Sequence, residues 1–241
     1  MIARALCWVC SSVLIVGCAG APKESIPTYP LMDVQQSLAA MQQRNEGVES
    51  ITGEGTVTMF DAKGGSVRLD AAFAFALPNA TRIRAYKFGQ AVLDLTVKSE
   101  EVWLYLPRQD GRAQDVRKAS RSVAGAVELW LQLLGGGAAF GSWDTAGNKF
   151  IITDPRDRTT MRLEIDRRTL TFRRCAMFGD EESEQFTLDL DRYRQVGNTV
   201  WPGRIKATSA SGTILIEMRD VELNAAPPAA FQPPPRAERL P

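Results

Sequence analysis

The stretch "VRLDAAFAFALPNATRIRAYKFGQAVLDLTVKSEEVWLYLP", Val67–Pro107, decides the class of fold that the sequence predicts. Its apolar residues, among them Phe73 and Phe75, alternate with polar or small ones, and Pro78-Asn79 ends the first run. Successive side chains on a β-strand point to opposite faces of the sheet. The pattern therefore predicts strands with one buried and one solvated face, and the short breaks between runs favour antiparallel hairpins.

The same alternation continues through most of the chain. It indicates about eleven strands, over residues 51–60, 67–77, 81–88, 93–97, 101–107, 148–154, 161–166, 169–178, 186–190, 199–209 and 214–218. Neighbouring strands lie about 4.8 Å apart, so an open sheet of this size would be roughly 50 Å wide. Sheets of that width usually curl, split or flatten.

Two amphipathic helices accompany the strands. The first has an apolar stripe at helical spacing, formed by Leu31, Val34, Leu38 and Met41. The second has a stripe formed by Val123, Val127, Trp130, Leu131 and Leu134. It stops at Gly135–Gly137, and these glycines indicate a hinge.

The helices are too few to cover the apolar face of so wide a sheet. Each helix is about 10 Å across, so two helices cover about 20 Å, and the sheet must curl to hide the remainder. A partly empty apolar concavity, suited to acyl chains, is one outcome. Its wall is predicted to consist of Leu69, Phe73, Phe75, Ile83, Leu93, Leu95, Val97, Leu104, Met161, Leu163, Phe186 and Leu188. A closed barrel filled by its own side chains remains open as an alternative on these residues alone.

The N-terminal stretch "LCWVCSSVLIVGCAG", Leu6–Gly20, indicates export and lipidation. Its apolar run of about a dozen residues is shorter than the roughly 20 that span a bilayer, and Arg4 is its only flanking charge. Ile15-Val16-Gly17-Cys18 resembles a bacterial lipobox, which predicts a signal peptide over 1–17 and acylation of Cys18. We expect a flexible tether over 18–30, one domain over 31–223 and a proline-rich tail over 224–241.

The composition argues against catalysis and against nucleic-acid binding. The chain contains no histidine, the commonest general base and metal ligand. Removal of residues 1–17 leaves equal numbers of basic and acidic side chains, whereas nucleic-acid binding needs a basic surface. We therefore expect no enzyme activity, no metal and no cofactor.

Three polar or reactive groups fit structural roles better than functional ones. The acidic run at 180–184 is typical of a solvated hairpin loop rather than a cation site. The arginines at 167–168 and 173–174 fit a solvated sheet edge better than a site for anionic lipid headgroups. Cys175, the lone thiol of the folded part, fits packing better than reactivity.

The order of these features resembles the LolA/LolB lipoprotein-carrier superfamily. The resemblance covers roughly Val48–Pro235. It rests on the lipobox, the first helix, the segment 75–107 with its Arg-Ile-Arg strand, and the closing "LNAAPPAAFQPPP". It implies an unclosed half β-barrel, mainly β with two or more covering helices. The helical residues Val123, Val127, Trp130 and Leu134 would then belong to a lid.

The resemblance also implies a function and a location. It implies that the cavity binds the acyl chains of lipids or lipoproteins, with a periplasmic carrier protein as a further partner. Ala19, rather than aspartate, follows Cys18, which favours the outer membrane, facing the periplasm. LolB, the closer relative in layout, has a protruding loop with an exposed leucine, whereas the turn Phe88–Ala91 has none. An envelope interaction or stress-sensing module of the same fold therefore remains an alternative.

Overall fold

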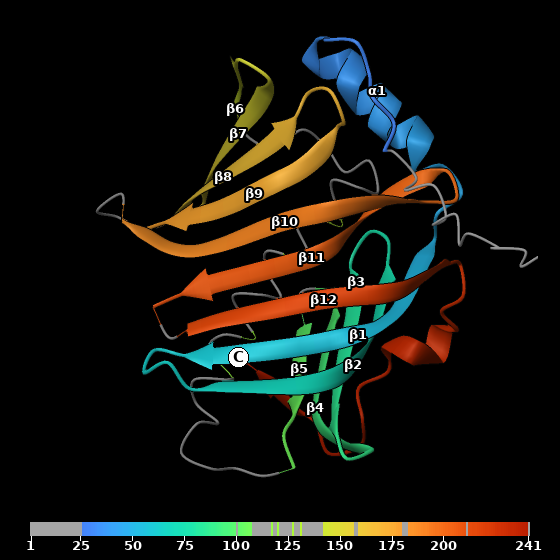
Figure 1. The fold of residues 1–241 in the computed structure, drawn as a ribbon, viewed down its shortest axis with the longest axis vertical. Helices are drawn as coiled ribbons and strands as arrows, with labels where there is room; N and C mark the ends of the chain where they lie inside the picture. Colours follow the sequence, from blue (N-terminus) through green and yellow to red (C-terminus); the bar gives the residue numbers. More distant parts are fainter. Residues whose placement is uncertain are drawn as a thin grey trace, which may run out of the picture.

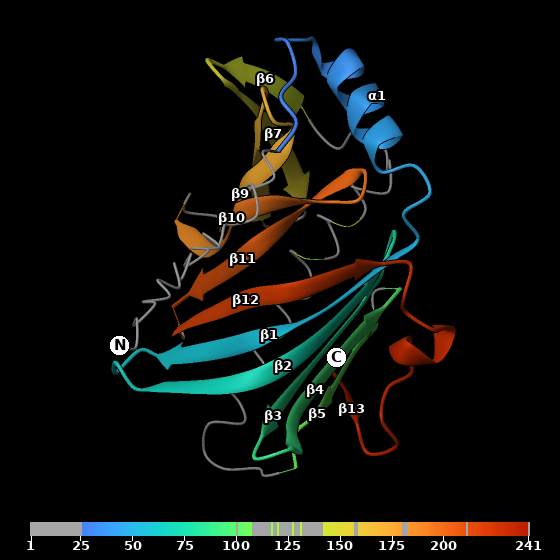
Figure 2. The same ribbon diagram turned by 45° about the vertical axis from the view of Figure 1, so that its right-hand side comes forward.

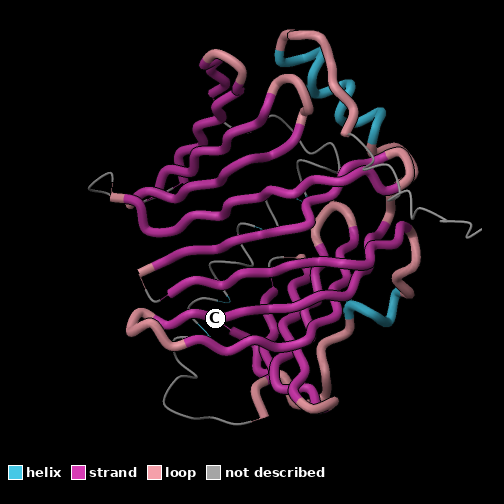
Figure 3. The backbone as a smooth tube through the Cα atoms, viewed as in Figure 1, coloured by secondary structure: helices cyan, strands magenta, loops and turns pink. Residues whose placement is uncertain are grey.

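One large antiparallel sheet organises the molecule. The computed structural model describes residues 26–99, 101–107, 142–156, 159–179, 183–210 and 212–240, together with Arg117, Ser120, Val127 and Leu131. Thirteen strands lie in the order β13-β5-β4-β3-β2-β1-β12-β11-β10-β9-β8-β7-β6. The sheet is not closed, since β13 and β6 are its two edges. Strands make up most of the described chain (Figure 3).

The helical elements with defined bounds in the described part of the chain are α1 (Val34–Arg44) and the short 3₁₀ helix η1 (Pro228–Phe231). The strands are β1 (Ser50–Asp61), β2 (Ser66–Ala76), β3 (Ala80–Lys87), β4 (Gln90–Lys98), β5 (Glu101–Tyr105), β6 (Ser142–Ala146), β7 (Lys149–Arg156), β8 (Thr159–Asp166), β9 (Thr171–Phe178), β10 (Glu184–Val196), β11 (Thr199–Ser209), β12 (Gly212–Leu223) and β13 (Glu238–Leu240).

The sheet is strongly curved. Figure 1 shows β3, β4 and β5 turned behind β1 and β12, and in Figure 2 the same strands run at a steep angle to β1 and β12. The ladder shifts register at several points, including Glu54/Gly55 in β1 and Ala85/Tyr86 in β3, and such bulges increase local twist and bend a strand. Gly55 is required at the first of them, because a Cβ there would lie 1.9 Å from the carbonyl oxygen of Glu217.

All eleven predicted strands correspond to observed ones, but the predicted number is too low. The additional strands are β6 and β13, which form the two edges of the sheet. β13 comes from the segment predicted as a tail, and Arg239 pairs with Trp103 of β5. The sheet therefore extends into residues 224–241.

The prediction of two or more covering helices is not matched within the described residues, where α1 is the one α-helix with defined bounds. It begins at Val34 rather than Leu31, because Asp33 and Gln36 form a capping box. Leu31 is 54% exposed, whereas Met41 is buried in the core.

The C-terminal end of α1 is fixed to the sheet by Arg44. This buried guanidinium donates to the carbonyl oxygens of Thr169 (3.0 Å) and Leu170 (2.9 Å) in the β8–β9 turn. Burial lowers the pKa of Arg44. The predicted tether also contacts the sheet at its described end, where the Tyr29 N–H donates to the carbonyl of Arg168 at 2.6 Å.

Candidate functional site

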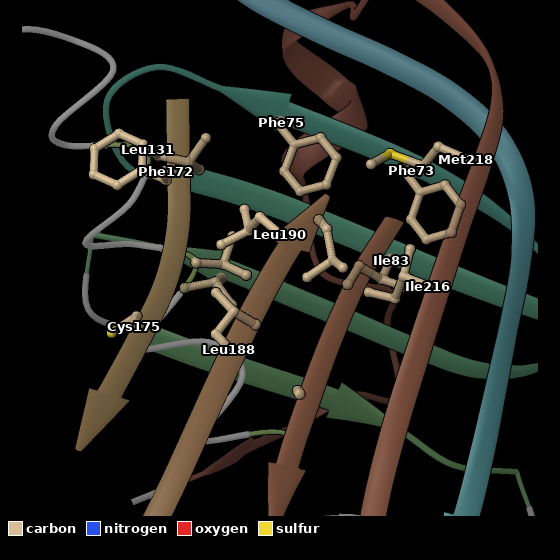
Figure 4. Packing of buried hydrophobic residues seen from close by; sticks show 14 of the residues in the cluster. Phe73, Phe75, Ile83, Leu131, Phe172, Cys175, Leu188, Leu190, Ile216 and Met218 are labelled. Atoms are coloured by element: carbon tan, nitrogen blue, oxygen red, sulfur yellow. The ribbon is translucent and has the colours of Figure 1, made fainter. Parts of the chain in front are cut away.

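All twelve residues predicted to line the cavity lie in one buried hydrophobic cluster. They come from β2, β3, β4, β5, β8 and β10, and none is more than 8% exposed. Figure 4 shows part of this cluster, with Phe73, Phe75 and Ile83 on one side and Leu188 and Leu190 on the other. The structure therefore brings the predicted residues together, on the concave face of the sheet.

Cross-strand pairing arranges apolar side chains of this face in continuous rows. One row crosses four strands through the pairs Phe73↔Ile83, Ile83↔Leu95 and Leu95↔Leu104. A second row crosses eight strands through Ile152, Leu163, Cys175, Leu188, Ala207, Ile214, Met59 and Val67. Paired side chains on one face lie about 4.5–5.5 Å apart, so each row forms an unbroken apolar surface.

The curvature brings the two halves of this face into contact. The rings of Phe75 in β2 and Trp201 in β11 lie 5.1 Å apart, although β1 and β12 separate these strands in the sheet. Trp201 is fully buried. Trp201 is not among the residues predicted from the sequence, because its place opposite Phe75 depends on the bend of the sheet.

The predicted second helix can be followed at two residues of its apolar stripe, of which Val127 is also a predicted lid residue. Val127 and Leu131 are helical and buried in the cluster, with 2% and 0% exposure. They are four residues apart, the spacing that places side chains on one helix face. Val123, Trp130 and Leu134 lie outside the described residues.

A groove of about 510 Å³ lies where α1 meets the β2–β3 turn. Its lining is mixed, with apolar residues from both elements and polar ones from the end of the helix: Ala39, Gln42, Gln43, Asn45, Glu46, Val48, Leu77 and Pro78. Val48 belongs to the buried cluster. The groove therefore borders the hydrophobic interior at the α1 end of the sheet.

On the outer face, Asp94 binds two arginines of the neighbouring strand. Arg82 donates through Nε and Nη2 to the two carboxylate oxygens, at 2.9 and 2.7 Å, and Arg84 donates to one of them at 3.0 Å. Arg82 also donates to the carbonyl of Ala230 in η1. The face of these strands that was predicted to be solvated is covered at Arg82, whose side chain is only 12% exposed beneath η1.

The β3–β4 turn exposes a large apolar side chain that the sequence analysis did not recognise. Phe88 is 94% exposed and has φ 51°, followed by Gly89 with φ 75°. This two-residue connection suits asparagine and glycine, while a bulky residue with positive φ costs of order 1 kcal/mol or more. The turn lies at the end of the sheet opposite α1, because β3 starts beside the beginning of β1.

Two of the arginines that were predicted at a sheet edge have acidic partners. Arg174 pairs with Glu184 at 2.7 Å and Arg173 with Asp166 at 3.5 Å. Cys175 is buried in the core, and residues 180–182 lie outside the described part. No group of acidic or cysteine side chains within the described residues could hold a metal ion. The described helices include none that is both long and apolar enough to cross a bilayer.

No family model matches the sequence, and no curated protein matches it. Solved structures do match the fold. A DUF1329 family protein from Desulfovibrio piger has a TM-score of 0.57 at 10% identity, over 82% of this chain and 95% of that one. A domain from Vibrio parahaemolyticus, described as that of an outer membrane lipoprotein-sorting protein, has a TM-score of 0.57 at 11% identity, over 81% and 94% of the two chains.

A LolA superfamily protein from Nitrosomonas europaea has a TM-score of 0.54 at 10% identity, over 83% of this chain and 98% of that one. The molecule thus belongs to the class of proteins built on one open, curved antiparallel sheet, and these solved structures share its fold. The particular fold is similar to that of a LolA superfamily protein and of a lipoprotein-sorting domain, so the resemblance drawn from the sequence is confirmed at the level of the fold.

Proposed function

We propose that this chain is a lipid-anchored protein of the bacterial envelope that binds acyl chains of lipids or lipoproteins on its concave face. The observation that carries the proposal is the pair of unbroken apolar rows on that face, in a fold shared with a lipoprotein-sorting domain. Burial of an acyl chain contributes about 0.8 kcal/mol per methylene, so reversible burial suffices for carriage and no catalytic group is needed.

Lipids bound to the purified chain test the proposal directly. The full-length chain is extracted with organic solvent after purification in a non-lipid detergent, and the extract is analysed by mass spectrometry. We expect co-purifying acyl lipids near one per chain. A chain that folds normally and yields no lipid, and that takes up no added fatty acid, would contradict the proposal.

Cys18 is the proposed anchor, placed at the outer membrane and facing the periplasm. Cys18→Ser is expected to stop incorporation of radiolabelled palmitate and to move the chain from the membrane to the soluble fraction. One acyl chain anchors a protein only marginally, whereas several chains on one residue anchor it durably. The substitution Cys10→Ser, within the predicted signal peptide, is the matched control and should change neither property.

Phe88 is proposed to contact the membrane when cargo is transferred. Phe88→Asn is expected to raise stability, because asparagine adopts positive φ readily and Asn-Gly favours this turn, by about 0.5–1 kcal/mol. The same change should weaken vesicle binding at least tenfold, since a buried Phe contributes about 1.5–3 kcal/mol. Both are measured on a Cys18→Ser background, by thermal unfolding and by vesicle sedimentation. A gain in stability with unchanged vesicle binding would assign Phe88 no membrane role.

A second candidate is an envelope interaction or stress-sensing module that transports no ligand. It is favoured by the burial of all twelve wall residues, which is what a filled interior would give. The two candidates differ in whether the interior opens to admit a ligand.

A further inference from the structure

The convex face of the sheet carries a pocket of about 340 Å³, and four of its eight lining residues are arginines. Its lining consists of Thr56, Arg68, Arg192, Arg194, Gly203, Glu217, Met218 and Arg219. Thr56 and Glu217 alternate along their strands with buried core residues, so the pocket opens on the face opposite the apolar rows. It is therefore separate from the proposed acyl-chain site.

The pocket exists because the sheet splits at this point. β11 and β12 pair from Arg204↔Glu217 to Ser209↔Gly212, and no pairs join Thr199–Gly203 to Met218–Leu223. Figure 1 shows the two strands separating toward the right. Pro202 has no N–H to donate, and Gly203 faces the irregular residue Arg192, whose φ is 52°.

The charges in the pocket are unbalanced. Four arginines line the pocket but only one acidic residue does, Glu217, whose carboxylate already accepts a hydrogen bond from Arg192 at 2.9 Å. Asp70, the cross-strand partner of Thr56, and Asp220, which follows Arg219, do not line the pocket, and Asp191 is bound by Arg204. An excess of three positive charges remains in a concave site.

The guanidinium group of Arg194 lacks a hydrogen-bond acceptor at Nε, which is a second indication that the pocket binds an anion. Its Nη2 donates across the split to the carbonyl of Met218 at 3.4 Å, while its Nε is inaccessible to solvent and has no acceptor. Arg68 and Arg219 form no ion pair with another described residue. Buried or clustered guanidinium groups without acceptors are unfavourable unless an anion joins them.

We infer that this convex pocket binds a phosphate group. The planar guanidinium fork matches phosphate oxygens in pairs, and several forks from different strands suit a tetrahedral anion with more than two acceptor oxygens. The phosphate has two chemical sources, a free phosphate ion or the headgroup of a phospholipid. The binding contacts are the same for both, and the experiment separates them.

Phosphorus NMR of the full-length chain tests the inference with two soluble probes, inorganic phosphate and glycerophosphoglycerol, the headgroup of phosphatidylglycerol. At constant ionic strength, the chain should broaden the phosphorus signal saturably. Arg219→Gln and Arg194→Gln should each weaken binding at least tenfold. Arg239→Gln, which removes the same charge from the edge strand β13, should weaken it less than twofold.

Tighter binding of the headgroup probe assigns the site to a phospholipid, and tighter binding of inorganic phosphate assigns it to the free ion; either supports the inference. If neither probe binds saturably, or if Arg239→Gln weakens binding as much as Arg219→Gln, the inference is overturned. Arg68 and Arg219 are exposed, so Arg68→Gln provides a second folded variant if Arg194→Gln unfolds. Acyl-lipid extraction remains independent of this result.

Discussion

Replacing Leu95 with glutamate is expected to weaken binding of a fluorescent fatty acid at least tenfold, while the thermal unfolding midpoint falls by less than about 5 °C. Leu95 lies between Ile83 and Leu104 in the apolar row and is 4% exposed. If the interior opens to admit an acyl chain, water can enter around the new carboxylate in the free protein. A bound acyl chain excludes that water, so the free-energy cost of desolvating the carboxylate weakens the binding of the fatty acid.

The opposite pattern identifies a filled interior. A carboxylate buried in a permanently dry core costs several kcal/mol, and the unfolding midpoint would then fall by about 10 °C or more. Collapse of the fold, or unchanged fatty-acid binding, would contradict the carrier proposal and favour the interaction module. Lys98→Glu, at the exposed end of the same strand, serves as the control and should change neither measurement.

The central strands could be predicted because the residues that alternate in polarity along the sequence also alternate in burial. In β2, Leu69, Phe73 and Phe75 are buried and alternate with more exposed residues, so the period in the sequence is also the period of burial. β6 lacks that signal because four of its five residues are exposed along a free edge of the sheet. β13 has only three residues, and its pairing with β5 depends on a long connection.

The candidate site likewise has residues that the sequence predicts and features that it does not. The alternation places the wall residues on one face, and the structure agrees for all twelve. The alternation cannot show that Phe88 occupies a turn with positive φ, or that β11 pairs with β12 only from Arg204 onward. It also cannot show what covers the outer face at Arg82, since that cover comes from η1, far along the chain. These features depend on non-local packing and backbone geometry, which leave no periodic signal.

Asp94→Ala is expected to destabilise the protein by about 3–5 kcal/mol, the usual cost of removing one partner of a buried ion pair. The side chain of Asp94 is 3% exposed and binds both Arg82 and Arg84. Its loss leaves the guanidinium of Arg82 largely buried with the Ala230 carbonyl as its remaining acceptor among the described residues. The thermal unfolding midpoint should fall by about 10 °C.

An exposed ion pair serves as the control, because it shows what the loss of a carboxylate costs when the ion pair is not buried. Glu101 pairs with Arg239 at 2.8 Å, but both side chains are largely exposed, so Glu101→Ala should cost less than about 1 kcal/mol. Because Arg82 joins β3 to η1, Asp94→Ala should also speed proteolytic cleavage near Ala230, whereas Glu101→Ala should not. Equal, small shifts in both variants would mean that η1 is held by the packing of Phe231 rather than by the Arg82–Asp94 pair.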